Sequence, residues 1–372
     1  MKLKNFNLKD NKKRVLIAPL DWGLGHATRC IPIIYSFIDQ HFEVIIAASG
    51  PVKNLLQKEF PNVVFTQLNG YKIRYSNKGA WLPLKLTLQF PGLLWSIYSE
   101  HRWLKKTIRD YHIDLVISDN RLGLHDTRIP CIYITHQLKI LTGNRFTEWL
   151  AQQIHYFFIN KYTACWVPDN AAENNLAGNL SHPKKLPAVP VKYLGPLSRF
   201  EKNAGEKKYD LLVLISGPEP QRTIFESLIA KELKGFSGKV LVVRGLPGTL
   251  ENDSTILAEP DKITIVNHLC AVALNDVIQQ SECIISRSGY TTIMDLVKLG
   301  QKAILIPTPG QTEQEYLAAY LTAKKIFFSV QQKDFLLHDV LQKAAVFPFL
   351  SMDLHTDEYK KTVRKLIGSL NS

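Results

Sequence analysis

The chain has 372 residues, of which 45% are hydrophobic and 21% are charged, and this length suits two globular domains better than one core. Its five cysteines are scattered and form no C-x-x-C pair, which favours buried, reduced thiols and argues against a metal cluster. No apolar stretch approaches the ~20 residues that a membrane helix needs, and residues 1–13 are polar and rich in lysine, unlike a signal peptide. We therefore expect a cytoplasmic protein.

The formal net charge is +13, and a basic surface suits nucleic acid, anionic lipid or phosphorylated substrates. Lysines and arginines are spread along the chain, and none of the usual nucleic-acid-binding motifs is present. We therefore expect no nucleic acid partner and favour a phosphorylated substrate or an anionic membrane surface.

Strand-like and helix-like patterns alternate along the chain, which predicts parallel α/β sheets. In the first half we expect strands at 14–20, 43–48, 63–67, 114–118 and 131–135, with helices at 26–40 and 52–59. The pattern breaks around 192–205, and a second series of strands is expected at 210–215, 240–244, 263–266, 283–286 and 303–307. We therefore predict a linker near 196–208. The domains are predicted at 1–197 and 198–350, and a final helical segment at 351–372 has room to cross back onto the first domain.

The first strand runs into Asp21-Trp22-Gly23-Leu24-Gly25-His26. Glycines at this turn let the backbone approach a ligand closely, but Thr28 stands where a dinucleotide motif has its third glycine, and no Walker lysine follows. His26 lies at a helix entrance, and an imidazole that titrates near ~6.5 can accept a proton from a hydroxyl at neutral pH. His26 is our first candidate for a catalytic base and Asp21 our second. The alternative is that His26 only caps or packs the helix.

Two neighbouring strand ends in the second half carry polar loops that enter helices. The first is Arg287-Ser288-Gly289-Tyr290-Thr291-Thr292-Ile293-Met294-Asp295, and the second contains Glu313-Gln314-Glu315. A small-residue turn at a helix start offers backbone N–H groups to an anion, and Asp295 adds a carboxylate near the same place. Since the carboxyl ends of parallel strands share one edge of a sheet, the two loops predict a nucleotide site.

This pair of loops resembles the donor-binding region of MurG-like glycosyltransferases of family 28, whose motif is R-S-G-x-x-T-x-x-E followed by a D-x-Q-Q-type loop. Thr292 is in register with that motif, and Asp295 stands in place of its glutamate. The resemblance implies the GT-B fold, two Rossmann-like domains with parallel sheets that face each other across a cleft. It also implies that Asp295 holds the ribose hydroxyls of a UDP-sugar, that Gln314 and Glu315 hold the sugar, and that Arg287, Ser288 and Gly289 bind the donor with Thr292.

Three further segments of the first 222 residues match the family in part. Gly25-His26 matches the end of G-G-T-G-G-H, which implies that His26 is the catalytic base. Arg199 stands where the family's G-N-P-V-R segment has a diphosphate-binding arginine, and the guanidinium fork suits that task; a solvated linker arginine is the alternative. Ser216-Gly217 matches part of the G-G-S-x-G phosphate loop, although the prolines that follow remove N–H donors.

The acceptor side departs most from the family. Its H-E-Q-N segment corresponds to Thr135-His136-Gln137-Leu138, so that the glutamate becomes His136. The resemblance implies that the acceptor pocket is lined by residues that follow strand ends, namely Asp119, Arg121, His136 and Gln137. Residues 81–106 mix aromatic, leucine and basic residues, and such a helix can lie on an anionic membrane surface or fill the first domain's core. Because of these differences from the family, we do not expect this chain to use the family's peptidoglycan acceptor.

The residues and the resemblance together predict an inverting, metal-independent hexosyltransferase. It would move a hexosyl or N-acetylhexosaminyl group from a UDP-sugar, as co-substrate and without another cofactor, to the hydroxyl of a lipid-linked or glycan acceptor. No D-x-D metal motif stands at a loop. We expect the protein in the cytoplasm at the inner face of the cytoplasmic membrane. The alternatives are a UDP-sugar 2-epimerase of the same fold and a non-catalytic nucleotide-sugar-binding subunit.

Overall fold

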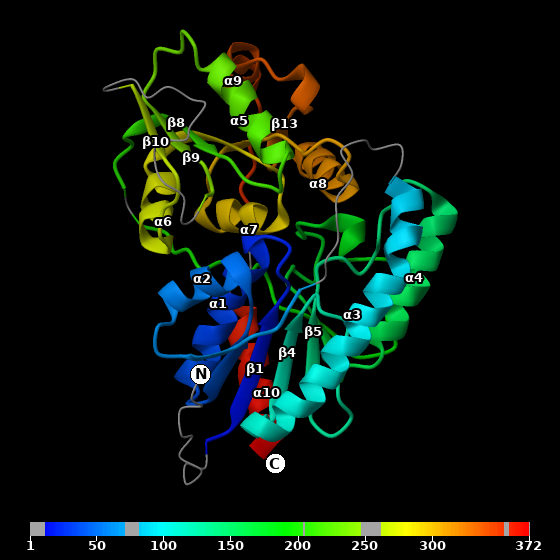
Figure 1. The fold of residues 1–372 in the computed structure, drawn as a ribbon. Coiled ribbons are helices and arrows are strands. Elements are labelled where there is room, and N and C mark those ends of the chain that lie inside the picture. Colours follow the sequence, from blue (N-terminus) through cyan, green and yellow to red (C-terminus); the bar gives the residue numbers. More distant parts are fainter. Residues whose placement is uncertain (1–11, 71–81, 204, 247–261, 353–356, 372) are drawn as a thin grey trace.

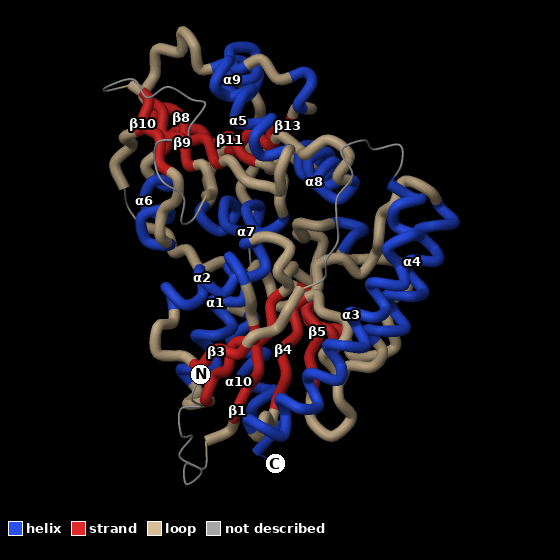
Figure 2. Tube along the Cα trace, viewed as in Figure 1, coloured by secondary structure: helices blue, strands red, loops and turns tan. Residues whose placement is uncertain are grey.

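The chain folds into two stacked α/β domains, each built on a parallel sheet (Figure 1). The computed structural model describes residues 12–70, 82–203, 205–246, 262–352 and 357–371. The first sheet has seven strands in the order β3-β2-β1-β4-β5-β6-β7, and the second has six in the order β10-β9-β8-β11-β12-β13. Figure 2 shows helices around both sheets and α7 on the side of the second domain that faces the first.

The first domain contains eleven of the described helices and strands besides a short 3-10 turn. They are β1 (Arg14–Pro19), α1 (Leu24–Asp39), β2 (Glu43–Ala47), α2 (Gly50–Glu59), β3 (Val64–Thr66), α3 (Leu82–Tyr111), β4 (Leu115–Asp119), β5 (Cys131–Ile134), α4 (Arg145–Ile159), β6 (Ala164–Val167) and β7 (Val191–Tyr193). The turn covers Gly178–Leu180.

The second domain follows the same plan. Its elements are β8 (Tyr209–Leu214), α5 (Gln221–Glu232), β9 (Val240–Val243), β10 (Ile263–Val266), α6 (Ala271–Gln279), β11 (Ser281–Ser286), α7 (Tyr290–Leu299), β12 (Ala303–Leu305), α8 (Thr312–Ala323), β13 (Phe328–Ser329) and α9 (Leu337–Ala345). The last helix, α10 (Glu358–Asn371), lies against α1 and β7 of the first domain (Figure 1).

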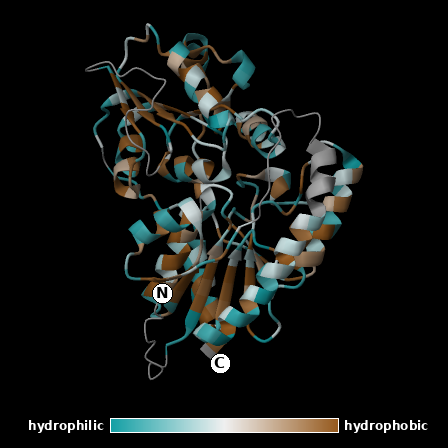
Figure 3. Cartoon of the chain, in the orientation of Figure 1, coloured by the Kyte–Doolittle hydropathy of each residue, from teal (hydrophilic) through white to brown (hydrophobic). Residues whose placement is uncertain are grey.

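The central strands are largely apolar because both faces of each sheet are covered. In β1, Val15 and Ile17 belong to one core cluster and Leu16 and Ala18 to another, as alternate side chains of a strand point to opposite faces. Figure 3 shows this as strands coloured hydrophobic beneath helices of mixed colour. The cluster that holds Val15 continues into the second domain, so the two domains share one packed core.

The expected fold class, two Rossmann-like domains with parallel sheets, is confirmed. Most expected strands appear within one or two residues of their predicted bounds, but β6, β7 and β13 were not expected. These strands have four, three and two residues, too few to set up a recognisable pattern. The predicted boundary after residue 197 lies in the segment between β7 and β8.

Candidate active site

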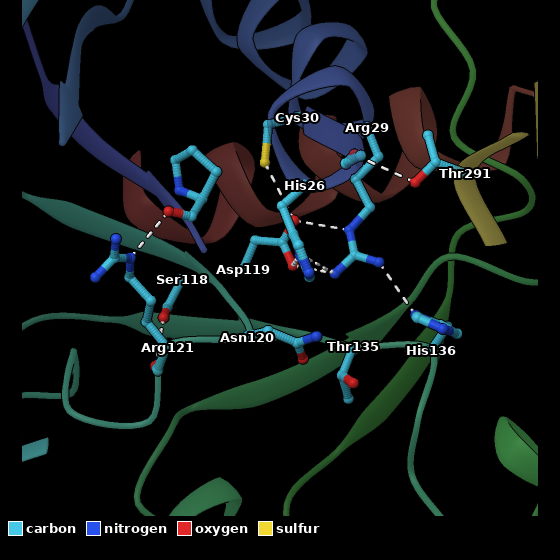
Figure 4. A network of polar contacts seen from close by, with 12 residues as sticks. His26, Arg29, Cys30, Ser118, Asp119, Asn120, Arg121, Thr135, His136 and Thr291 are labelled. Atoms are coloured by element: carbon cyan, nitrogen blue, oxygen red, sulfur yellow. Dashed lines mark hydrogen bonds and ion pairs between the residues drawn. The ribbon is translucent and has the colours of Figure 1, made fainter. Parts of the chain in front are cut away.

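The centre of the candidate site is a histidine paired with a buried carboxylate. His26 lies in the first turn of α1, and its Nδ1 is 3.2 Å from Oδ1 of Asp119, the last residue of the neighbouring strand β4 (Figure 4). Asp119 is 0% exposed. Burial alone would raise the pKa of this carboxyl, but Arg29 and His26 hold the pKa well below its usual range. Asp119 is therefore ionised and can orient the imidazole of His26.

Arg29 joins these two groups from the next turn of α1. Its guanidinium binds both carboxylate oxygens of Asp119, with Nε 2.7 Å from Oδ2, and Nη2 lies 2.9 Å from Nδ1 of His26. Burial and the charge of Arg29 lower the pKa of His26, against the opposing effect of Asp119. His26 is therefore held as a neutral imidazole near neutral pH, the form that can accept a proton.

A second histidine links this group to the other domain. Arg29 Nη1 is 3.1 Å from Nδ1 of His136, which follows β5. The other ring nitrogen of His136, Nε2, is 2.7 Å from Oε1 of Glu313, in the first turn of α8. The His136 ring also stacks on Tyr290 of α7, with ring centroids 4.1 Å apart. The polar network therefore runs from His26 in the first domain to Glu313 in the second.

Two residues expected in or beside this centre lie elsewhere. Asp21 faces Nη2 of Arg121 at 3.6 Å, so the carboxylate beside His26 is that of Asp119. Arg121 is 0% exposed and binds the carbonyl of Pro19 and the carboxylate of Glu100. The expectation that Arg121 lines an acceptor pocket is wrong for this arrangement, because its side chain is fully buried inside the domain. Gln137 is half-buried beside His136.

The glycine turn before α1 brings the domains into close contact. Gly23 precedes α1 with φ of 105°, a conformation that favours glycine. The carbonyl of Gly25 accepts a hydrogen bond from Thr291 Oγ1 at 3.2 Å, and a Cβ placed on Gly25 would lie 2.9 Å from that oxygen. The predicted catalytic loop and the predicted donor loop therefore touch directly.

In the donor loop, Arg287 is buried and braces the domain. Its guanidinium donates to the carbonyls of Ile306, Pro307 and Gln221 at 3.2 Å and lies 4.0 Å from the Phe225 ring centre. Burial lowers its pKa to about 10. We expected Arg287 to bind the donor directly, but the structure turns its side chain into the domain, where it holds three loops in place.

The rest of this loop is placed at the start of α7. The hydroxyl of Ser288 donates to the carbonyl of Gln314 at 2.8 Å, which joins the two predicted donor loops. Gly289 is the N-cap of α7 and has open space where a Cβ would stand. The first N–H groups of a helix have no partner within the helix, so this end can receive an anion. Thr292 is half-buried in the same turn.

Asp295 and Arg199 lie together between the domains. The Asp295 carboxylate accepts a hydrogen bond from Ser198 at 2.5 Å, and burial raises its pKa to about 6 in spite of the nearby charge of Arg199. Arg199 is half-buried, and its Nε has no hydrogen-bond partner within the described part of the chain. A guanidinium that is partly desolvated and incompletely paired is suited to an anionic ligand.

The remaining predicted donor residues either bind the backbone of their own loop or are exposed. Gln314 binds the backbone N–H of Thr308 at 3.0 Å, and Glu315 binds that of Gly310 at 2.9 Å, so both shape their own loop. Ser216 and Gly217 are exposed after β8. Among the described residues no group of three or more His, Cys, Asp or Glu could hold a metal ion.

Three members of the network were missed by the sequence analysis: Arg29, Tyr290 and Glu313. Arg29 is one helical turn beyond His26, a spacing that puts both on one face of α1. Glu313 was noticed only as part of its loop. Nothing in the sequence shows that it meets His136, because that contact joins residues 177 positions apart.

The contact between Gly25 and Thr291 yields a prediction about domain association. A Gly25→Ala substitution places a methyl group too close to the Thr291 hydroxyl, and overpacking of this kind costs about 1–3 kcal/mol. We expect a lower melting temperature and a larger radius of gyration in X-ray scattering. Thr291→Ala in the same chain removes the clashing oxygen and should restore both. Gly92→Ala, where the new methyl meets open space, is the control, and an equal loss there would contradict the prediction.

The raised pKa of Asp295 predicts a pH effect on stability. Because the folded-state pKa of about 6 exceeds the ordinary 3.8, the folded state binds more protons between these values, and the contribution of Asp295 becomes less favourable as pH rises through them. Each unit of pKa corresponds to about 1.4 kcal/mol. Asp295→Asn should therefore gain stability relative to the wild type between pH 4 and pH 7.5 in denaturant titrations. The prediction would be refuted if the difference in free energy of unfolding between the two proteins were the same at both pH values.

The family model for the glycosyltransferase family 28 C-terminal domain matches residues 223–354. A UDP-N-acetylglucosamine–N-acetylmuramyl-(pentapeptide) pyrophosphoryl-undecaprenol N-acetylglucosamine transferase of Haemophilus ducreyi is 25% identical over 150 residues, which cover 40% of this chain and 42% of that protein. An uncharacterized glycosyltransferase of Methanosarcina acetivorans is 23% identical over 332 residues, 82% of each chain. The chain spans about half the length of the first two curated relatives that it matches.

Solved structures share the arrangement of the two domains. Phytolacca americana UGT2, complexed with UDP-2fluoro-glucose and pterostilbene, superposes with a TM-score of 0.60 at 13% identity, over 98% of this chain and 95% of that one. This likeness shows the GT-B fold. Together with the family match it confirms the resemblance drawn from the two C-terminal loops: this chain resembles MurG-like glycosyltransferases, and its residues 223–354 match the glycosyltransferase family 28 C-terminal domain.

Proposed function

We propose that this protein is an inverting glycosyltransferase that moves a hexosyl or N-acetylhexosaminyl group from a UDP-sugar to an acceptor hydroxyl without a metal ion. The observation that carries the proposal is the His26–Asp119 pair, next to a turn that contacts the family 28 domain. His26 and Asp119 are 3.2 Å apart, and the turn that holds His26 touches Thr291 in the donor loop.

In the proposed reaction Nε2 of His26 takes the proton of the acceptor hydroxyl while Nδ1–H donates to Asp119. The hydroxyl oxygen then forms a bond to the anomeric carbon of the sugar, and the bond from that carbon to the donor phosphate breaks. Its electron pair leaves with the nucleoside diphosphate. Direct displacement inverts the anomeric centre. The ionised Asp119 stabilises the imidazolium as it forms, as in other histidine–carboxylate pairs.

The leaving diphosphate needs positive charge, and two features of the structure can supply it. Arg199 has an unpaired Nε within the described residues, and the N-terminus of α7 at Gly289 presents backbone N–H groups and a helix dipole. Asp295, beside Arg199, would accept hydrogen bonds from the ribose hydroxyls. A uridine donor is favoured because the Haemophilus relative is named for UDP-N-acetylglucosamine and the Phytolacca structure holds UDP-2fluoro-glucose.

The surface formed by α3 and α4 favours an acceptor carried on a membrane lipid. The side chains of residues 81–90 lie outside the described part. Beyond them, exposed aromatic residues occur on both helices: Trp95, Tyr98, Phe146, Trp149 and Phe157. A cavity of about 940 Å³ beside Trp95 is lined by five cationic side chains, namely Arg102, Lys105, Lys106, Arg109 and Arg128. Of the described helices none is long and apolar enough to cross a membrane. We propose that this surface contacts an anionic bilayer and so meets an acceptor of the cell envelope.

His26→Ala is expected to lower turnover of a UDP-sugar with its acceptor by 10²- to 10⁴-fold, the usual share of a general base, with UDP binding nearly unchanged. Turnover is measured as UDP release, and binding by calorimetry. His338→Ala, on the exposed side of α9, is the matched control. Wild-type turnover in His26→Ala would remove this residue from the mechanism. A new UDP-sugar formed without acceptor would point to the epimerase, and UDP binding without turnover in the wild type to a binding subunit.

The membrane proposal predicts a charge-dependent affinity for vesicles. Each basic residue near an anionic surface contributes about 1 kcal/mol, so that the triple variant Lys105→Gln, Lys106→Gln, Arg109→Gln should bind phosphatidylglycerol vesicles roughly 100-fold more weakly in a sedimentation assay. Lys333→Gln with Lys343→Gln, on the second domain, is the control. Equal vesicle affinity of the triple variant and the wild type would contradict the proposal.

A further inference from the structure

We propose that Glu313 of the second domain is a positioning residue, which acts through His136 and Arg29 to hold His26 in the tautomer that can accept the acceptor proton. The active base would then form only when the two domains are together. This inference rests on the proposed function, because it assigns a role relative to His26.

The protons of His136 can be placed from its neighbours. Arg29 has only N–H donors, and its Nη1 is 3.1 Å from Nδ1 of His136, so that Nδ1 must accept. The ring proton is then on Nε2, which donates to the Glu313 carboxylate at 2.7 Å. A doubly protonated ring would turn Nδ1–H toward the guanidinium. Glu313 and Arg29 therefore fix His136 as a neutral bridge with one defined tautomer.

His26 has two competing neighbours at a single nitrogen. Its Nδ1 lies 3.2 Å from Asp119, which requires a donor, and 2.9 Å from Nη2 of Arg29, which requires an acceptor. If Nδ1 carries the proton, Nε2 is free to take another from the acceptor hydroxyl. If Nδ1 accepts from Arg29, the proton is on Nε2 and the ring cannot act as a base. The direction in which Arg29 donates thus determines whether His26 is active.

Glu313 acts on the orientation of the Arg29 guanidinium through His136, which binds Nη1 of Arg29, whereas His26 faces Nη2. A carboxylate on the far side of an imidazole orients the ring and raises the basicity of its other nitrogen, so that Glu313 makes Nδ1 of His136 a better partner for the guanidinium. The stack of His136 on Tyr290 fixes the ring plane. With Arg29 held by His136 and Asp119, Nδ1 of His26 is left to donate to Asp119.

The contact between Glu313 and His136 joins the two domains, so it depends on their association. Glu313 is on α8, whereas His136 follows β5 of the first sheet. Its neighbour Thr312 donates to the carbonyl of Leu141 at 2.9 Å, also across the boundary. The carboxylate that binds His136 therefore comes from the other domain. Separation of the domains would withdraw it and release Arg29 toward His26.

The groups that face His26 set the sign of the pH effect. They are Arg29 on its own helix, Asp119 at the end of β4, His136 after β5 and, beyond His136, Glu313 on α8. Loss of the negative charge of Glu313 disfavours protonation of His26. A variant without that charge should therefore have a lower His26 pKa, and the acid limb of its kcat/KM profile should move to lower pH.

The experiment compares Glu313→Gln, Glu313→Asp and His26→Ala with the wild type, with Glu358→Gln as a control that removes one exposed surface charge. For Glu313→Gln we expect a kcat at least tenfold lower, with little change in the KM for the UDP-sugar, and an acid limb displaced to lower pH. Glu313→Asp should recover part of both. An inactive His26→Ala beside a Glu313→Gln with wild-type kcat and pH profile would overturn this inference and leave the proposed function standing. An active His26→Ala would remove His26 from the mechanism and this inference with it, whereas the absence of sugar transfer by the wild type would overturn the proposed function itself.

A second readout does not depend on activity. Nitrogen-15 NMR of the histidine rings reports which nitrogen carries the proton. In the wild type we expect His26 with the proton on Nδ1 and His136 with it on Nε2, and in Glu313→Gln a shift of His26 toward the Nε2 form. Unchanged His26 signals in Glu313→Gln would contradict the proposal.

Discussion

The arrangement of the candidate site depends on the burial of one carboxylate. Asp119 is 0% exposed and lies at the end of β4, and an unpaired charge in that position would cost several kcal/mol. The cost is offset by the Arg29 fork on both carboxylate oxygens. That fork can form only if α1 presents its second turn to β4, and the same orientation places His26 against Asp119. The pairing of the buried Asp119 charge with Arg29 therefore also determines the position of His26.

A comparable constraint organises the second domain. Arg287 is 1% exposed, and its guanidinium is held by the carbonyls of Gln221, Ile306 and Pro307. Gln221 begins α5 after β8, and Ile306 and Pro307 follow β12. The Arg287 side chain therefore connects loops at the carboxyl ends of two strands. Ser288 adds the link to the loop of Gln314. These contacts connect the loops that would receive the donor, and the first turn of α7 contacts the first domain through Tyr290 and Thr291.

The sequence was informative where function follows from local pattern. Apolar strands followed by polar loops predicted both sheets, and the Arg287–Asp295 motif predicted the family, because turn chemistry and strand ends are encoded locally. It was less informative about partners that meet only in three dimensions. Arg121 was placed in an acceptor pocket, but its side chain is buried inside the domain, where it binds Glu100. Asp119 was expected among the acceptor-side residues, and its contact with His26 was not foreseen. Glu313 had no assigned role, since its contact with His136 exists only once the domains are assembled.

We propose that the second domain binds a uridine diphosphate sugar beside His26. The most direct test is calorimetric titration of the purified protein with UDP, GDP, TDP and NAD, each with and without magnesium. We expect selective binding of UDP that does not depend on magnesium. Absence of nucleotide binding, or a preference for NAD, would contradict it and would leave the turn from Arg287 to Asp295 as a structural feature of the fold.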